Sequence, residues 1–109
     1  MLEIYGLKNC DTCRKAQKAL KSFGKEFSFI DVRDKPLSPD RLQFFYAQLG
    51  DALLNKKSTT WRNLDDAQKK EPVIDLLEKH PTLMKRPLIQ TKDRCSLGWS
   101  DDIANQFVG

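Results

Sequence analysis

The chain has 109 residues, of which 39% are hydrophobic and 31% charged, and a formal net charge of +4. This length and composition are typical of one globular domain. No apolar run approaches the ~20 residues of a membrane span, and no basic run with interleaved aromatic residues stands out. We therefore expect neither a membrane nor nucleic acid among the partners.

The cysteines are Cys10, Cys13 and Cys95, an odd number that does not suit the disulfide framework of a secreted protein. No basic segment followed by an apolar one precedes the first apolar run, so we expect a cytoplasmic protein. A structural zinc site normally has four Cys or His ligands. Only Cys95 and His80 could complete such a set, and neither stands in a ligand-pair spacing. We expect no metal and interpret the close pair as redox chemistry.

The first elements in chain order form a β-α-β unit. Leu2–Tyr5 is a predicted strand, and the apolar spacing after it predicts a helix over Asp11–Phe23 that ends at Gly24. Phe27–Val32 is a second predicted strand with partial alternation. A β-α-β connection implies parallel strands and a right-handed crossover.

The middle of the chain is predicted to be a mostly helical insertion, from residue 38 to about residue 82. Ser38 is a candidate N-cap and Pro39 a first helical residue, and Gly50 ends that helix. Further along, the pattern predicts a helical turn, a polar stretch and two more helices, over residues 52–54, 55–62, 64–70 and 72–80. The last of these ends at His80, because a residue that precedes proline is disfavoured in a helix.

The strand pattern returns after the insertion. Residues 88–91 and 94–97 are predicted strands that flank a turn at Lys92–Asp93, and Ser100 is a candidate cap of a last helix over residues 101–107. The order β-α-β, helices, β-β-α predicts an α/β fold of the thioredoxin-like kind, with a mixed four-stranded sheet. We expect a single domain of residues 1–109, acting as a monomer.

Cys10 and Cys13 form a Cys-x-x-Cys motif at the junction of the first strand and the first helix. A helix N-terminus has free backbone N–H groups and a partial positive charge, and both favour a thiolate. Lys8, Arg14 and Lys15 add positive charge nearby. We therefore interpret Cys10 as the nucleophile. Cys13, about one helical turn later, either resolves a mixed disulfide or is an inert thiol.

Four stretches carry a family resemblance, namely residues 2–12, 53–62, 85–88 and 97–101. With them the chain resembles the arsenate reductase (ArsC) family, in the branch of the Spx regulators and the YffB-type proteins, and most of all the YffB type. The resemblance implies a thioredoxin-like fold with a helical insertion. It also implies that Cys10 is the redox-active thiol and that Arg86–Pro87 lies beside it with a cis peptide bond.

The predicted site joins two parts of the chain. Its catalytic candidates are Cys10, Cys13 and Arg86, and the guanidinium of Arg86 is expected to pair with an oxyanion or carboxylate and to lower the pKa of Cys10. The candidates for substrate binding surround them: Lys8, Asn9, Asp11, Thr12, Arg14, Arg86 and Pro87. Cys95 is interpreted as a buried strand residue, with a distant resolving cysteine as the alternative. Lys56, Lys57 and Arg62 are either a solvated face or help to hold an anionic thiol such as glutathione.

These features predict a thiol–disulfide oxidoreductase, glutathione-dependent, with no bound cofactor. One alternative is an arsenate reductase that acts with glutathione and glutaredoxin. Members of the family that reduce arsenate use three arginines, but Gly50–Asp51 and Leu97–Trp99 stand where two of them are expected, and Arg62 and Arg94 are the possible substitutes. The other alternative is an Spx-like redox sensor that binds RNA polymerase.

Overall fold

A computed structural model describes residues 2–91 and 94–107, and its centre is one sheet of four strands. The strands are β1 (Leu2–Gly6), β2 (Phe27–Asp31), β3 (Leu88–Gln90) and β4 (Cys95–Leu97), in the spatial order β2-β1-β3-β4. β1 pairs parallel with β2, whereas β3 runs antiparallel to both β1 and β4. The predicted mixed sheet and parallel β-α-β unit are confirmed.

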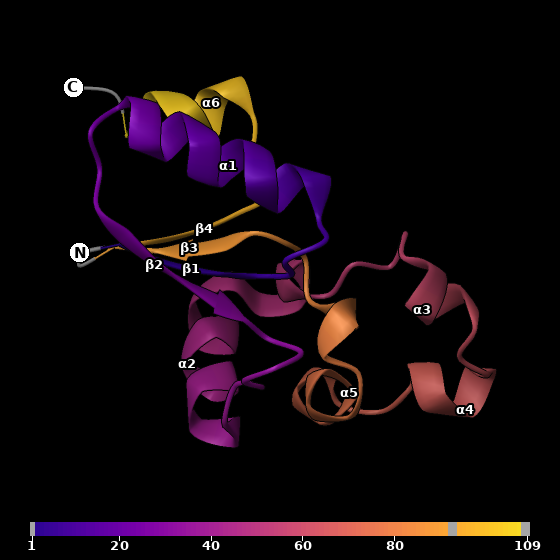
Figure 1. The fold of residues 1–109 in the computed structure, drawn as a ribbon. Coiled ribbons are helices and arrows are strands. Elements are labelled where there is room, and N and C mark those ends of the chain that lie inside the picture. Colours follow the sequence, from indigo (N-terminus) through magenta and orange to yellow (C-terminus); the bar gives the residue numbers. More distant parts are fainter. Residues whose placement is uncertain (1, 92–93, 108–109) are drawn as a thin grey trace.

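Helices cover both faces of this sheet (Figure 1). α1 (Asp11–Ser22) and α6 (Asp101–Asn105) lie on one face, and α2 (Pro39–Leu49) lies on the other. α1 packs through Cys13, Ala16 and Leu20, whose spacing places them on one side of the helix. The arrangement is a thioredoxin-like α/β fold.

The predicted insertion is present between β2 and β3. Apart from α2 it consists of short elements: η1 (Gly50–Leu53), α3 (Thr59–Arg62), α4 (Asp66–Lys69), α5 (Val73–Lys79) and η2 (Pro81–Leu83). The predicted cap at Ser38 is confirmed, because its Oγ accepts the Arg41 N–H at 3.3 Å. α3 was not predicted, since a helix of this length has too few residues to show a periodic pattern.

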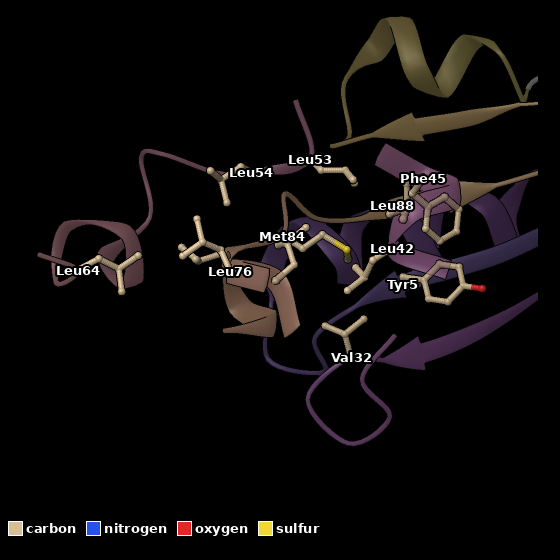
Figure 2. Close-up of a cluster of buried hydrophobic side chains, with 12 residues drawn as sticks. Tyr5, Val32, Leu42, Phe45, Leu53, Leu54, Leu64, Leu76, Met84 and Leu88 are labelled. Carbon is tan, nitrogen blue, oxygen red and sulfur yellow. The ribbon is translucent and has the colours of Figure 1, made fainter. Parts of the chain in front are cut away.

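Two apolar clusters form the core, one on each face of the sheet. Neighbouring residues of a strand point to opposite faces, so Ile4 and Ile89 join the cluster beneath α1, while Tyr5 and Leu88 join the cluster on the side of α2. The second cluster continues into the insertion, where Met84 lies between Leu76 and Leu42 (Figure 2). The insertion is therefore packed onto the sheet through shared apolar side chains.

The observed elements start and end within a few residues of the predicted positions. The short helix predicted over residues 64–70 is α4 at Asp66–Lys69, and the last helix, predicted over residues 101–107, ends two residues earlier, at Asn105. The turn predicted at Lys92–Asp93 lies outside the described residues. Within the described part of the chain, no helix is both long enough and apolar enough to cross a membrane.

Candidate functional site

Cys10 is the N-cap residue of α1, with extended backbone angles of φ −94° and ψ 118°. Its thiol is half-buried, and this burial alone would raise its pKa. The contributions that lower the pKa are together larger than this effect of burial. The largest of them come from the backbone N–H and the thiol of Cys13. The charge of Arg86 and the backbone N–H of Thr12 act in the same direction, so the pKa of Cys10 lies below its ordinary value. The site therefore favours a thiolate at Cys10.

Cys13 has the opposite character. It is fully buried on the inner side of α1, and this burial, together with the neighbouring Cys10, raises its pKa to about 12. The backbone N–H of Leu7 bonds to its sulfur and lowers the pKa by less than burial raises it. Cys13 is thus a protonated thiol at neutral pH, and its hydrogen bond with Cys10 stabilises the Cys10 thiolate.

Gly6, at the end of β1, makes room for the sulfur of Cys13. A Cβ atom at position 6 would stand 2.5 Å from the Cys13 Sγ, a distance that real Cβ contacts do not show. The structure assigns this glycine to β1 as its last residue. Glycine is required at position 6 because the Cys13 sulfur approaches its Cα closely, and not because the backbone adopts a special conformation there.

Arg86 and Pro87 lie beside the motif, although more than seventy residues separate them from it in the chain. The Arg86–Pro87 peptide bond is cis, as the resemblance implies, and Pro87 is buried. The Nη1 of Arg86 donates to the backbone oxygen of Thr82 at 3.0 Å, which holds the guanidinium in place. Its positive charge lowers the pKa of both cysteines of the motif.

The cations closest to Cys10 in sequence are already paired. The Nζ of Lys8 lies 2.9 Å from the Asp34 carboxylate. Arg14 lies 3.8 Å from the Asp11 carboxylate and donates through Nε to the Lys8 backbone oxygen at 3.1 Å. The positive charge that acts on Cys10 thus comes from Arg86. The predicted substrate-binding roles of the residues around the motif stay predictions: Lys8, Asn9, Asp11, Thr12, Arg14, Arg86 and Pro87.

Asp31 is a site residue that the sequence did not reveal. Its Oδ2 accepts the backbone N–H of Lys8 at 2.9 Å, and its Oδ1 accepts that of Arg33 at 2.8 Å. These bonds, with that from Lys8 the strongest, hold the pKa of Asp31 below its ordinary value. One signal was present: β1 and β2 are parallel, so an acidic residue that ends β2 lies at the same sheet edge as the loop that follows β1.

An open groove of about 420 Å³ adjoins the motif. Leu7 and Arg86 belong to its wall, and both also contact the cysteines electrostatically or by hydrogen bonding. The rest of the lining comes from the turn after β2, from the segment around the start of α3 and from η2: Arg33, Asn55, Lys57, Ser58, Thr59, Thr60 and Thr82. Among these described residues none is acidic.

Other candidates from the sequence lie elsewhere. Cys95 pairs with Gln90 in the sheet and packs on the cluster beside α2, and burial raises its pKa. Arg94 lines a different pocket with Leu2 and Lys25, and Arg62 is not part of the groove wall. In the described part of the chain, no three Cys, His, Asp or Glu side chains gather in a way that could hold a metal ion.

Comparisons with known proteins agree with this architecture. The model of the ArsC family matches residues 5–107. An uncharacterized protein of Haemophilus influenzae is 40% identical over 106 residues, which cover 93% of each chain. The solved structure of a protein named YFFB covers all of both chains, with a TM-score of 0.92 and 29% identity.

A regulator is also among the relatives. The global transcriptional regulator Spx 1 of Oceanobacillus iheyensis is 25% identical over 114 residues. The match covers 99% of the present chain and 87% of the regulator. Relatives of this chain thus include a protein with a regulatory role, so the function of this chain has to be argued from its own site.

Proposed function

The chain belongs to the ArsC family, and we propose that within this family it is a thiol–disulfide oxidoreductase with Cys10 as nucleophile and glutathione as co-substrate. The observation that carries the proposal is the contrast between the two thiols of the motif. The pKa of the half-buried Cys10 is lowered next to Arg86, which lines the groove, whereas Cys13 is buried and its pKa is raised to about 12. A nucleophilic thiol has to be deprotonated, and a thiol that donates a hydrogen bond to it has to stay protonated. Cys10 and Cys13 meet these two requirements.

The proposed reaction has two exchange steps. The Cys10 thiolate attacks one sulfur of a disulfide, so that a bond forms between this sulfur and Cys10 and the disulfide bond breaks. The other half leaves as a thiolate and takes a proton from solvent. A glutathione thiolate then attacks the substrate sulfur that is attached to Cys10. This step releases Cys10 as a thiolate and joins glutathione to the substrate half in a new disulfide. Each step exchanges one sulfur–sulfur bond for another, so no bound cofactor is required.

Three groups support Cys10 in this scheme. The Cys13 thiol and the first backbone N–H groups of α1 donate to the thiolate, and the fixed charge of Arg86 stabilises it. Pro87, buried next to Arg86, shapes the wall against which an extended substrate would lie. We propose external glutathione as the main resolving thiol, because Cys13 is fully buried and its raised pKa leaves little thiolate.

The reaction requires a single chain, and we propose that a monomer carries it out in the cytoplasm. Glutathione keeps thiols reduced in that compartment. Glutaredoxin is a possible further partner, because it removes glutathione from mixed disulfides by the same exchange chemistry.

The test compares variants of the two motif cysteines. Cys10→Ser is expected to abolish glutathione-dependent reduction of a small disulfide, because no other described thiol combines exposure with a lowered pKa. Cys13→Ser keeps a hydroxyl donor and is expected to retain most of the rate, whereas Cys13→Ala removes the donor to the thiolate and is expected to slow the reaction about tenfold. The control is Cys95→Ser, whose position on the other face of the sheet predicts a near-normal rate. Full turnover by Cys10→Ser would overturn the proposal.

Arsenate reduction is a second candidate, which the family and the guanidinium of Arg86 beside Cys10 favour. Its weakness is that Arg62 and Arg94, the expected substitutes for the missing arginines, do not line the groove, where Arg33 is the other arginine of the wall besides Arg86. An assay with arsenate, glutathione and glutaredoxin tests it directly. Reduction that depends on Cys10 would establish arsenate as a substrate.

A redox-sensing regulator is a third candidate, and the match to Spx 1 over nearly the whole chain favours it. In that case a disulfide between Cys10 and Cys13 would alter a surface that binds RNA polymerase. A pull-down with the polymerase α subunit, under reducing and oxidising conditions, distinguishes the two roles. Redox-dependent capture that Cys13→Ser abolishes would support the regulator over the enzyme.

A further inference from the structure

The groove beside Cys10 is lined by cations and hydroxyl groups. Arg33, Lys57 and Arg86 supply the positive charges, and none of the described lining residues is acidic. The whole chain has a net charge of only +4, with acidic and basic residues mixed along it. A wall with three cations and no acidic residue is therefore a local concentration of charge, placed where a substrate approaches the nucleophile.

Two of these cations have no counterion in the part of the chain that the structure describes. Among the described residues, no carboxylate lies within ion-pair distance of Arg33 or Lys57, whereas Lys8 and Arg14 are paired with Asp34 and Asp11. Both Arg33 and Lys57 are exposed. Their charges are available to a ligand in the groove, and those of the cations next to Cys10 in sequence are not.

The backbone that carries Lys57 is held in place on the segment that leads to Arg86. Asn55 donates through its backbone N–H to the Leu83 oxygen at 2.8 Å, and Lys85 donates to the Leu53 oxygen at 2.7 Å. The hydroxyls of Thr60 and Thr82 lie 3.0 Å apart, close enough for a hydrogen bond. This wall of the groove thus exists before a ligand binds, which reduces the entropy that binding costs.

The other wall is held equally firmly. The backbone N–H of Arg33 donates to the Asp31 carboxylate at 2.8 Å, and the same carboxylate accepts the N–H of Lys8 in the loop before Cys10. The Cys10 N–H in turn donates to the Leu7 oxygen at 3.2 Å, and Leu7 lines the groove. The groove cations and the nucleophile are therefore connected through short, hydrogen-bonded segments.

We propose that Arg33 and Lys57 are specificity determinants that select acidic disulfides, those whose halves carry carboxylates, over neutral and cationic ones. This inference rests on the proposed function of Cys10. A carboxylate of the bound half lies between the two unpaired cations, while the sulfur to be attacked lies at Cys10 near Arg86. Peptide disulfides with free carboxylates, of which oxidised glutathione is the simplest, belong to this class.

The experiment measures a ratio of rate constants. Reduced protein is mixed with oxidised glutathione, neutral bis(2-hydroxyethyl) disulfide or cationic cystamine, and loss of the fully reduced protein is followed by acid quench and mass spectrometry. The variant is Arg33→Ala/Lys57→Ala. We expect its ratio of the oxidised glutathione to the neutral rate constant to fall about tenfold, because each exposed ion pair contributes up to about fivefold. The ratio for cystamine should rise.

The control is Lys18→Ala/Lys21→Ala, which removes the same net charge from exposed positions of α1 that do not line the groove. An equal fall of the ratio in this control, or no fall in Arg33→Ala/Lys57→Ala, would overturn the inference while leaving the role of Cys10 intact. No reaction of Cys10 with any of the three disulfides would instead overturn the proposed function. Added salt should reduce the preference of the wild type, because screening weakens exposed charges.

A binding measurement checks the groove without the chemistry. S-methylglutathione carries the same carboxylates as glutathione but cannot exchange, and its titration can be followed by NMR chemical shifts. We expect the shifts to centre on the groove and the Kd to rise about tenfold in Arg33→Ala/Lys57→Ala but not in the α1 control. Unchanged affinity in the groove variant would contradict the inference even if the rates had changed.

Discussion

At the scale of single residues, the site depends on two thiols in one motif that differ in protonation. Cys10 caps α1 and is reached by backbone N–H groups, whereas Cys13 points inward onto Gly6. The Cys-x-x-Cys motif does not distinguish the two cysteines. Their difference in pKa arises mainly from the deeper burial of Cys13. Under the proposed function, burial of Cys13 supports Cys10, because it keeps the Cys13 thiol protonated next to the Cys10 sulfur.

The packing of Cys13 on Gly6 predicts a specific double-mutant result. Gly6→Ala is expected to lower the free energy of unfolding by about 1–3 kcal/mol. The new Cβ would overlap the sulfur of Cys13, which is buried and has little room to move away. Gly6→Ala/Cys13→Ala removes that sulfur, so the second substitution should relieve most of the cost of the first. Urea unfolding of both single variants and the double variant, under reducing conditions, measures this coupling.

The remaining neighbours of the added Cβ lie at ordinary contact distance, the Cβ of Cys13 and the ring of Phe29 each at 3.4 Å. Cys13→Ala alone provides the reference for loss of the thiol. If the two substitutions proved additive, the contact between position 6 and the sulfur would not be the source of the destabilisation.

At the scale of elements, Asp31 connects the end of β2 to the loop between β1 and α1. Its carboxylate accepts backbone N–H groups from both segments, at Lys8 and Arg33. Parallel strands bring these segments together, and just beyond β2 the backbone N–H of Val32 still donates to the Gly6 oxygen at 2.9 Å. One carboxylate thus orients both the approach to Cys10 and a wall of the groove.

This role makes part of the stability depend on pH. The native pKa of Asp31 lies below its ordinary value, because the N–H of Lys8 and then that of Arg33 favour the charged form. Its contribution is complete above the unfolded pKa of about 4 and is lost as the pH falls through the lower native pKa. Asp31→Asn should therefore cost about 1 kcal/mol at pH 7, after allowance for screening, and less at pH 3. Urea unfolding at both pH values measures the difference.

The matched control is Asp34→Asn. Asp34 is exposed and pairs only with the exposed Nζ of Lys8, so its removal should change the stability at pH 7 far less than Asp31→Asn does. Equal losses in the two variants would show that net charge, and not the backbone bonds of Asp31, explains the effect.

At the scale of the whole molecule, one sheet is shared by two cores. Trp99 packs against the cluster beneath α1, and Trp61 packs against the cluster that extends into the insertion. The strands contribute alternate residues to both clusters, so neither can be disrupted without loosening the other. This sharing predicts that the insertion and the sheet unfold together, as expected for the single domain of residues 1–109.

Single-tryptophan variants test this prediction. Trp61→Phe leaves Trp99 to report on the cluster beneath α1, and Trp99→Phe leaves Trp61 to report on the insertion. We expect the fluorescence midpoint of each variant in urea to coincide with its own midpoint by circular dichroism. A Trp61 transition at lower urea than the circular dichroism transition would show that the insertion unfolds independently.

The order of the elements and the position of Cys10 at the start of α1 were predictable because they depend on local patterns. Alternation marks strands, helical spacing marks α1, and a proline or a cap residue marks helix ends, as at Ser38. Cys10 follows from its position at the junction of β1 and α1. The family resemblance added Arg86, which no local pattern connects to Cys10.

The sequence by itself thus determined the thioredoxin-like order, the parallel unit and the place of Cys10. Only the tertiary structure decided which cations are paired, why position 6 is glycine, and that Asp31 joins two loops. It also decided that Arg33 and Lys57 line one groove. The physical reason is distance along the chain. These contacts join loops that meet only after the strands have paired and the insertion has packed onto the sheet. The periodic pattern within one segment therefore cannot predict them.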